Sequence, residues 1–491
     1  MKRAQLELAL RQSLPSRTLG FVLLWLCVGG AFDVEAASKS ADDKPPIPPD
    51  LFFESRPIPN EDNAIYFWRG AANTMVKPDD QISEAISYAW KPEAVSPSDE
   101  DHDAIRNWLD QNRDALRLVE TSLKKSASKW LATKGEELQP ELWTMGYMTK
   151  ARIASSDRLA AQGKWDEAAG LLEGNLRLSQ LAIESEAALI HYLVGGHART
   201  TTHRAILRLA NHRATPVKTL RRLLAALPSL DSETNTYANL LRVEFTIYEY
   251  PGVDIKWFAE AWSKPEVRNI ISLTYDDKYQ RPFMVLTDPG LVARHPKPFD
   301  QAAELERAAE TCRRFRTNAF SLWTNRVDAD EEPVEKIRTD LLEEIEPLMN
   351  LVSDEPLPLS QRAIAKARSA YLAIANPIGR IIQCKNSLLS GDAARVFRNR
   401  TEREAVRAVL AAIIFERQKE QLPDSLDDLV EGKIIQRIPW DHFANAPLKY
   451  SKTQRLIWSV GEDAEDDNGE GSTDAPWSDV DAVWRIPTRI K

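Results

Sequence analysis

The apolar residues of this chain recur at helical spacing, and no stretch before residue 430 alternates apolar and polar residues as a strand does. This pattern predicts helices over 101–125, 142–159, 215–227, 231–250, 299–323, 333–351, 360–390 and 401–419. Short strands are expected only near the C-terminus. The sequence therefore predicts a mainly α fold, with a helical-hairpin body followed by a small C-terminal α+β module.

Two helix boundaries are marked by their residues. Within 159–169, Gly163 is expected to end one helix as its C′ residue, and Ala168 is expected to face inward from the next helix. This turn resembles that of a tetratricopeptide-type hairpin of a helical repeat. Because only one copy is present, an ordinary antiparallel helix pair is the alternative. Thr215 and Pro216 predict a further helix start, with a capping hydroxyl and proline as the first helical residue.

The N-terminal segment is typical of an export signal. Basic residues precede an apolar core over 19–28, and Val34 and Ala36 supply the small residues of a cleavage site. The apolar run is short for a membrane span, which needs about twenty residues. We expect residues 1–36 to be a cleaved signal peptide and the protein to be exported to the periplasm or beyond. An uncleaved N-terminal membrane anchor is the alternative.

Proline and glycine divide the rest of the chain. Residues 37–60 are expected to form a linker, because they are rich in proline. Residues 61–400 are expected to form an all-α body with an irregular excursion over 251–299, where many prolines interrupt any long helix. Residues 401–491 are expected to form the α+β module.

Composition and motifs exclude several functions. The formal net charge of −9 argues against nucleic acid, whose phosphates need basic surfaces. The sequence has no H-E-x-x-H, G-x-S-x-G, phosphate-binding glycine loop or Cys-x-x-Cys. We therefore expect a non-enzymatic scaffold or binding protein with a protein or cell-envelope partner.

Two observations leave alternatives open. Trp257, Trp262 and Tyr275 fall in the irregular stretch, where aromatic side chains suit a carbohydrate platform. The alternative is thus a secreted hydrolase or carbohydrate-binding protein with its site in 251–299. Cys312 and Cys384 could pair in an oxidising compartment or simply be buried.

An acidic loop lies between Glu462 and Asp481, where nine carboxylates occur with no lysine or arginine. Calcium binds six to eight oxygens from carboxylates and backbone carbonyls, and glycines in this segment would let the loop wrap an ion. The spacing is not that of an EF-hand. The loop therefore predicts a calcium site, with a solvated acidic loop as the alternative.

The residues around this loop carry a resemblance. L-P-D-S-L-D-D-L-V begins at Leu422, a strand ends in S-V-G at Gly461, and D-V-D-A-V-W ends at Trp484. This order resembles the globular tail of the major pseudopilin of the type II secretion system, whose acidic loop binds calcium. The resemblance implies that Asp463 and Asp481 are calcium ligands, with Asp466 and Asp467 as their partners.

The resemblance is confined to the C-terminal module. Pseudopilins begin with a long apolar helix that polymerises, whereas the helix expected at 401–419 is amphipathic and follows a long helical body. We therefore do not expect this chain to build a pseudopilus. It is similar instead to large secreted bacterial proteins that carry such a tail after a helical body.

Overall fold

Helices predominate in the structure, a computed structural model, which confirms the mainly α class. It describes residues 47–53, 58–87, 98–129, 140–185, 189–228, 239–243, 246, 277–300, 302–310, 312–313, 331–383, 388–471, 477 and 481–487. The chain forms two compact units. The larger contains residues 54–132, 139–240 and 391–491, and the smaller contains residues 1–53, 133–138 and 241–390.

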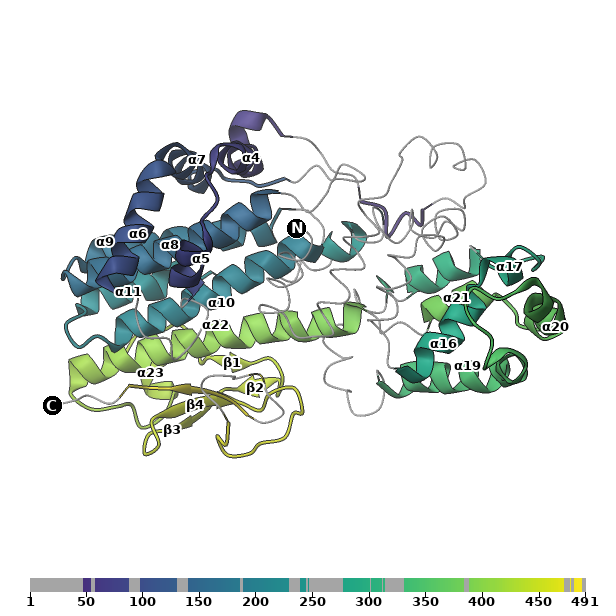
Figure 1. Cartoon of the computed structure of the whole chain (residues 1–491). Coiled ribbons are helices and arrows are strands. Elements are labelled where there is room, and N and C mark those ends of the chain that lie inside the picture. The colour runs from purple at the N-terminus through teal and green to yellow at the C-terminus, as the bar shows by residue number, and fades with distance from the viewer. Residues whose placement is uncertain are drawn as a thin grey trace. The chain divides into compact units, whose positions relative to one another are not determined.

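The larger unit is built from antiparallel helices around α9, which packs against both α8 and α10 (Figure 1). Its helical elements before the C-terminal module are η2 (Asn60–Asp62), α4 (Ala64–Thr74), α5 (Asp80–Ser87), α6 (Asp99–Gln111), α7 (Arg113–Leu123), α8 (Pro140–Ala161), α9 (Trp165–Ile183), α10 (Leu189–Asn211) and α11 (Val217–Ala226). None of the helices in the described part of the chain is long and apolar enough to cross a membrane.

The turn between α8 and α9 confirms the expected hairpin. Gly163 has a φ of +74°, a conformation that glycine adopts at little cost. The N–H of Lys164 donates to Leu159 O, and that of Gly163 donates to Ala160 O, which together form a Schellman motif. Ala168 is completely buried. The prediction of Gly163 as C′ residue and Ala168 as a packing residue is therefore correct.

The helix expected over 101–125 is wrong as a single element, because Asn112 divides it into α6 and α7. The Asn112 side chain accepts from the Val76 N–H at 2.7 Å and donates to Val76 O and Trp108 O. These bonds hold the extended segment at Val76, which is distant in sequence, against the junction of α6 and α7. Hydrophobic spacing continues across the break, so periodicity alone could not reveal it.

The start of α11 also differs from the prediction. The helix begins at Val217, with Pro216 as its N-cap and no side-chain capping bond. Thr215 Oγ1 donates instead to Leu209 O at the end of α10, at 2.6 Å. The threonine therefore closes the preceding helix and does not cap the next one.

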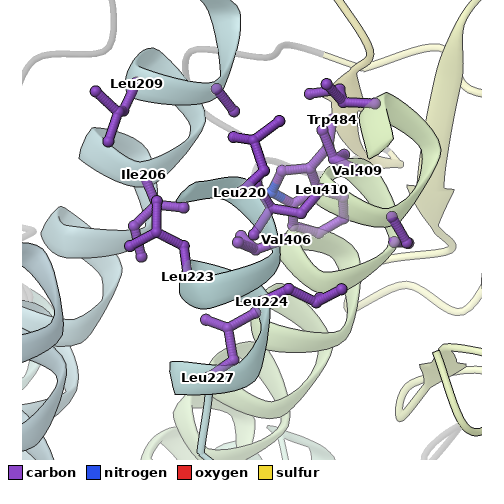
Figure 2. Close-up of a cluster of buried hydrophobic side chains, with 14 of the residues drawn as sticks. Ile206, Leu209, Leu220, Leu223, Leu224, Leu227, Val406, Val409, Leu410 and Trp484 are labelled. Carbon is purple, nitrogen blue, oxygen red and sulfur yellow. The ribbon is translucent and has the colours of Figure 1, made fainter. Parts of the chain in front are cut away.

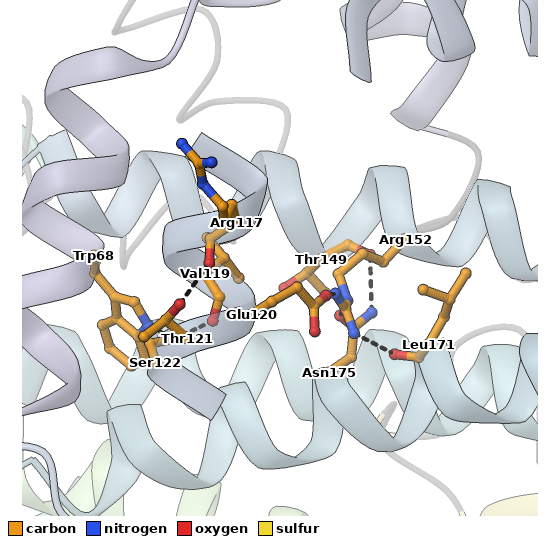
Figure 3. A network of polar contacts seen from close by, with 10 residues as sticks. All are labelled: Trp68, Arg117, Val119, Glu120, Thr121, Ser122, Thr149, Arg152, Leu171 and Asn175. Carbon is orange, nitrogen blue, oxygen red and sulfur yellow. Dashed lines mark hydrogen bonds and ion pairs between the residues drawn. The ribbon is translucent and has the colours of Figure 1, made fainter. Parts of the chain in front are cut away.

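A buried polar network holds α7, α8 and α9 together (Figure 3). Arg152 of α8 donates through Nε to Asn175 Oδ1 of α9 at 3.0 Å and pairs with Glu120 of α7. Asn175 in turn donates to Thr149 O at 3.0 Å. At Gly174 an added Cβ would lie 2.0 Å from an Arg152 nitrogen, so glycine makes room for the guanidinium.

The C-terminal module packs on the long helix α22 (Leu388–Lys419), which begins earlier than the expected 401. It contains α23 (Asp427–Glu431), β1 (Trp440–Asp441), β2 (Ala446–Pro447), β3 (Lys449–Ser451), β4 (Leu456–Ser459) and β5 (Ala482–Arg485). Strands β1 and β2 pair, and β3, β4 and β5 form an antiparallel sheet in that order. The α+β composition of this module matches the prediction.

One hydrophobic core joins the module to the helices of its unit. Leu220 and Leu223 of α11, Val406 and Leu410 of α22, and Trp484 of β5 belong to the same buried cluster (Figure 2). Burial of such side chains provides about 25 cal/mol per Å² of apolar surface, so the module and α22 stabilise each other.

The smaller unit packs its helices around a second apolar cluster. Its helices are α16 (Asp277–Leu286), α17 (Pro289–Val292), α19 (Glu331–Val352), α20 (Gln361–Leu372) and α21 (Pro377–Gln383). The expected helix over 360–390 is divided before Pro377, because proline disfavours the helical conformation at the residue that precedes it. Tyr371 Oη donates to Leu286 O at 2.7 Å within this core.

Several expectations concern segments that the structure describes only in part. The expected irregular stretch 251–299 contains α16 and α17 in its described portion, which corrects that prediction there. Of the helices expected over 231–250 and 299–323, residues 239–243, 302–310 and 312–313 are helical. Residues 1–36 and Cys384 lie outside the described residues, and Cys312 is buried.

Candidate calcium site

The acidic loop begins where β4 ends at Ser459. Its backbone turns sharply, because Gly461, Ala464, Asn468 and Gly469 all have positive φ angles. The loop closes on β5, which pairs with β4 so that Ser459 lies opposite Ala482. Asp481, directly before β5, is thereby placed against the loop.

Asp481 is the most deeply buried of the four predicted ligands, with 0% of its surface exposed. Its Oδ2 accepts from the Gly469 N–H at 2.7 Å. Its Oδ1 is buried and has no hydrogen-bond partner among the described residues. Burial raises the pKa of this carboxyl. Hydrogen bonds from the backbone N–H groups of Gly469 and Asp467 lower this pKa, and the negative charges of Asp466 and Asp467 raise it further.

Asp466 and Asp467 therefore lie close enough to act electrostatically on Asp481. Asp466 Oδ1 accepts from Trp458 Nε1 at 3.0 Å, and its Oδ2 pairs with Lys449 Nζ at 3.0 Å. These bonds lower the pKa of Asp466, with the Trp458 bond as the largest cause. Lys449 thus compensates part of the loop's negative charge from a strand outside the loop.

Asp463 is less well placed than the other three residues. Its Oδ1 accepts from the Glu465 N–H at 3.1 Å, a local turn within the loop. The neighbouring Glu462 pairs with Arg398 of α22. Asp466 and Asp467 therefore lie within electrostatic range of Asp481, whereas no described contact joins Asp463 to any of the three.

Asp441 is a second buried carboxylate that the sequence reasoning did not single out. Its Oδ1 accepts from Ser459 Oγ at 2.8 Å, and its Oδ2 accepts from the Val460 N–H at 3.0 Å. Burial raises the pKa of Asp441 against these bonds. Asp441 therefore positions the end of β4 from which the acidic loop starts. Its position between Trp440 and Phe443 was the available signal, because a carboxylate flanked by aromatic residues is a candidate for burial.

Within the described residues, no three histidine, cysteine, aspartate or glutamate side chains are arranged to hold a metal ion. Residues 472–476 and 478–480, which include Asp474 and Asp479, lie outside the described part. The orphaned Oδ1 of Asp481 fits a cation, because a buried carboxylate oxygen without a donor is costly unless a positive charge lies beside it.

Comparison with known proteins finds no family model, no curated protein and no solved structure that matches this chain. The pseudopilin-like tail and the tetratricopeptide-like hairpin therefore remain hypotheses based on sequence pattern. Trp257, Trp262 and Tyr275, the residues of the alternative carbohydrate site, lie outside the described residues.

Proposed function

We propose that this chain is an exported, non-enzymatic protein whose helical body is a scaffold or binding surface. Its partner would be a protein or a component of the cell envelope. Its C-terminal, pseudopilin-like module would be stabilised by calcium bound in the acidic loop. The absence of a catalytic motif in the sequence supports a binding role.

The observation that carries the calcium proposal is the unpartnered Oδ1 of Asp481 at full burial. A polar oxygen in that position costs about 1–3 kcal/mol when it has no partner. A bound cation would remove this cost and would also offset the repulsion from Asp466 and Asp467.

Calcium suits this loop better than other divalent ions. Its coordination is flexible and accepts a mixture of carboxylate oxygens, backbone carbonyls and water. Asp481 and Asp467 would be the inner ligands, while Asp466 would exchange its pair with Lys449 for the metal. Asp463 would close the site from the opposite end of the loop.

Calcium in the loop would act on the whole unit. Asp481 directly precedes β5, whose Trp484 belongs to the core shared with α11 and α22. Fixing Asp481 therefore fixes the strand that carries a core side chain. Calcium binding would therefore raise the free energy of unfolding of the larger unit, including its helices.

Thermal unfolding of the full chain tests this proposal. A ligand that binds only the folded state stabilises it by about 2.7 kcal/mol at a hundredfold excess over its Kd. The larger unit should therefore unfold at a higher temperature in calcium than in chelator, with a smaller effect of magnesium.

Asp481→Asn should abolish the calcium increment, because the amide keeps the shape of the side chain without its charge. Asp427→Asn, at an exposed position of α23 in the same module, is the matched control and should keep the increment. If wild-type protein unfolds identically in calcium and in chelator, the loop is only a solvated acidic segment.

A further inference from the structure

A second feature of the larger unit lies away from the acidic loop, between α6 and α8. The two helices leave a solvent-open cavity of about 280 Å³. Its floor is apolar, formed by Ile105, Leu109 and Leu159. A cavity of this size is at the small end of ligand sites, so it suits a single ring or a short chain.

The rim of this cavity is cationic. Arg106 and Arg158 line it, and no carboxylate among the described residues does. Both guanidinium groups share one exposed counterion outside the lining: Asp103 lies 3.1 Å from Arg106 and 3.7 Å from Arg158. Within the described residues, neither arginine has another ion pair, so the two guanidinium groups share a single direct counterion.

Three further groups offer unused hydrogen-bonding capacity. The side chains of His102, Ser155 and Gln162 line the cavity and make no hydrogen bond with any described residue. Burial lowers the pKa of His102, and the neighbouring Arg158 lowers it further against the nearby aspartates. The neutral imidazole can therefore both donate and accept a hydrogen bond.

We propose that this cavity binds a small organic carboxylate, with its apolar part on Ile105, Leu109 and Leu159. Its carboxylate would contact Arg106 and Arg158, because guanidinium groups bind planar carboxylates through paired hydrogen bonds. A phosphate would leave the apolar floor uncovered. An organic cation would be repelled by the rim.

Ligand-observed NMR titration of the full chain, with benzoate as the probe, tests this inference. Benzamide and benzylamine have similar shape but carry no charge and a positive charge, respectively. Benzoate should bind about tenfold more tightly than benzamide, and benzylamine should not bind. Equal binding of benzoate and benzamide would show that the arginines do not select a carboxylate.

Three variants test whether benzoate binds in the cavity between α6 and α8. Arg158→Gln should weaken benzoate binding about tenfold, whereas Arg113→Gln, an exposed arginine on α7, should leave it unchanged. Gln162→Trp places a large side chain at the exposed rim and should block the cavity without disturbing the core. Benzoate that fails to bind wild-type protein, or that binds Gln162→Trp or Arg158→Gln as wild type, would overturn the inference.

Discussion

Replacing Arg152 by leucine should destabilise the larger unit. In the structure, only 6% of the Arg152 side chain is exposed, and it joins α8 to Asn175 of α9 and to Glu120 of α7 (Figure 3). Leucine replaces the aliphatic part of the arginine side chain but has no hydrogen-bond donor. The change therefore removes the polar contacts of one side chain while leaving the helices themselves intact.

The magnitude follows from what each partner loses. Glu120 is 52% exposed, so the loss of its ion pair contributes little. Leu171 O, which accepts from Arg152 at 3.4 Å, keeps its own bond within α9. Asn175 Oδ1 is left buried without a donor, at about 1–3 kcal/mol. Together with the lost packing over Gly174, we expect a destabilisation of about 2–3 kcal/mol.

Hydrogen exchange of the backbone amides in α8 and α9, measured at increasing urea concentration, would report the change in the free energy of unfolding of these helices. Arg117→Leu is the matched control, because Arg117 is 77% exposed and pairs only with Asp114 among the described residues. It should shift stability by no more than about 0.5 kcal/mol. If Arg152→Leu is as mild as the control, the buried network does not stabilise the unit.

Two further predictions concern helices of the same unit. Ala168→Trp should destabilise the α8–α9 hairpin by about 1–3 kcal/mol, because a completely buried alanine leaves no room for an indole; wild-type melting of this variant would refute the close packing. Burial, with Lys150 and Arg204, lowers the pKa of His197 to about 3. Because the unfolded state takes up this proton at higher pH than the folded state, stability should fall by roughly 1.4 kcal/mol per pH unit as the pH is lowered from about 6.5 to about 3. His197→Gln should flatten this dependence in urea midpoints measured against pH, and an unchanged slope would exclude His197 as its source.

Local patterns predicted the fold where neighbouring residues determine it. Gly163 and Ala168 act within a few positions of their own turn, so the hairpin could be read from the sequence. Asn112 breaks its helix through bonds to Val76, and Thr215 bonds back to Leu209. Such contacts depend on how the chain folds over itself, and hydrophobic spacing does not encode them.

The candidate site shows the same division. The strand end before Gly461 and the closing strand after Asp481 lie where the pattern placed them. Lys449 of β3 and Arg398 of α22 compensate part of the negative charge of the loop. The sequence of the loop does not reveal them, because both residues lie outside it. A loop that reads as purely acidic is therefore partly neutralised by its surroundings.

Isothermal titration of calcium into the full chain tests the central claim most directly. We expect one calcium ion to bind per chain through the buried Asp481, and we expect the binding heat to disappear in Asp481→Asn but to persist in Asp427→Asn. Absence of binding heat in folded wild-type protein, or the same heat in Asp481→Asn, would contradict it.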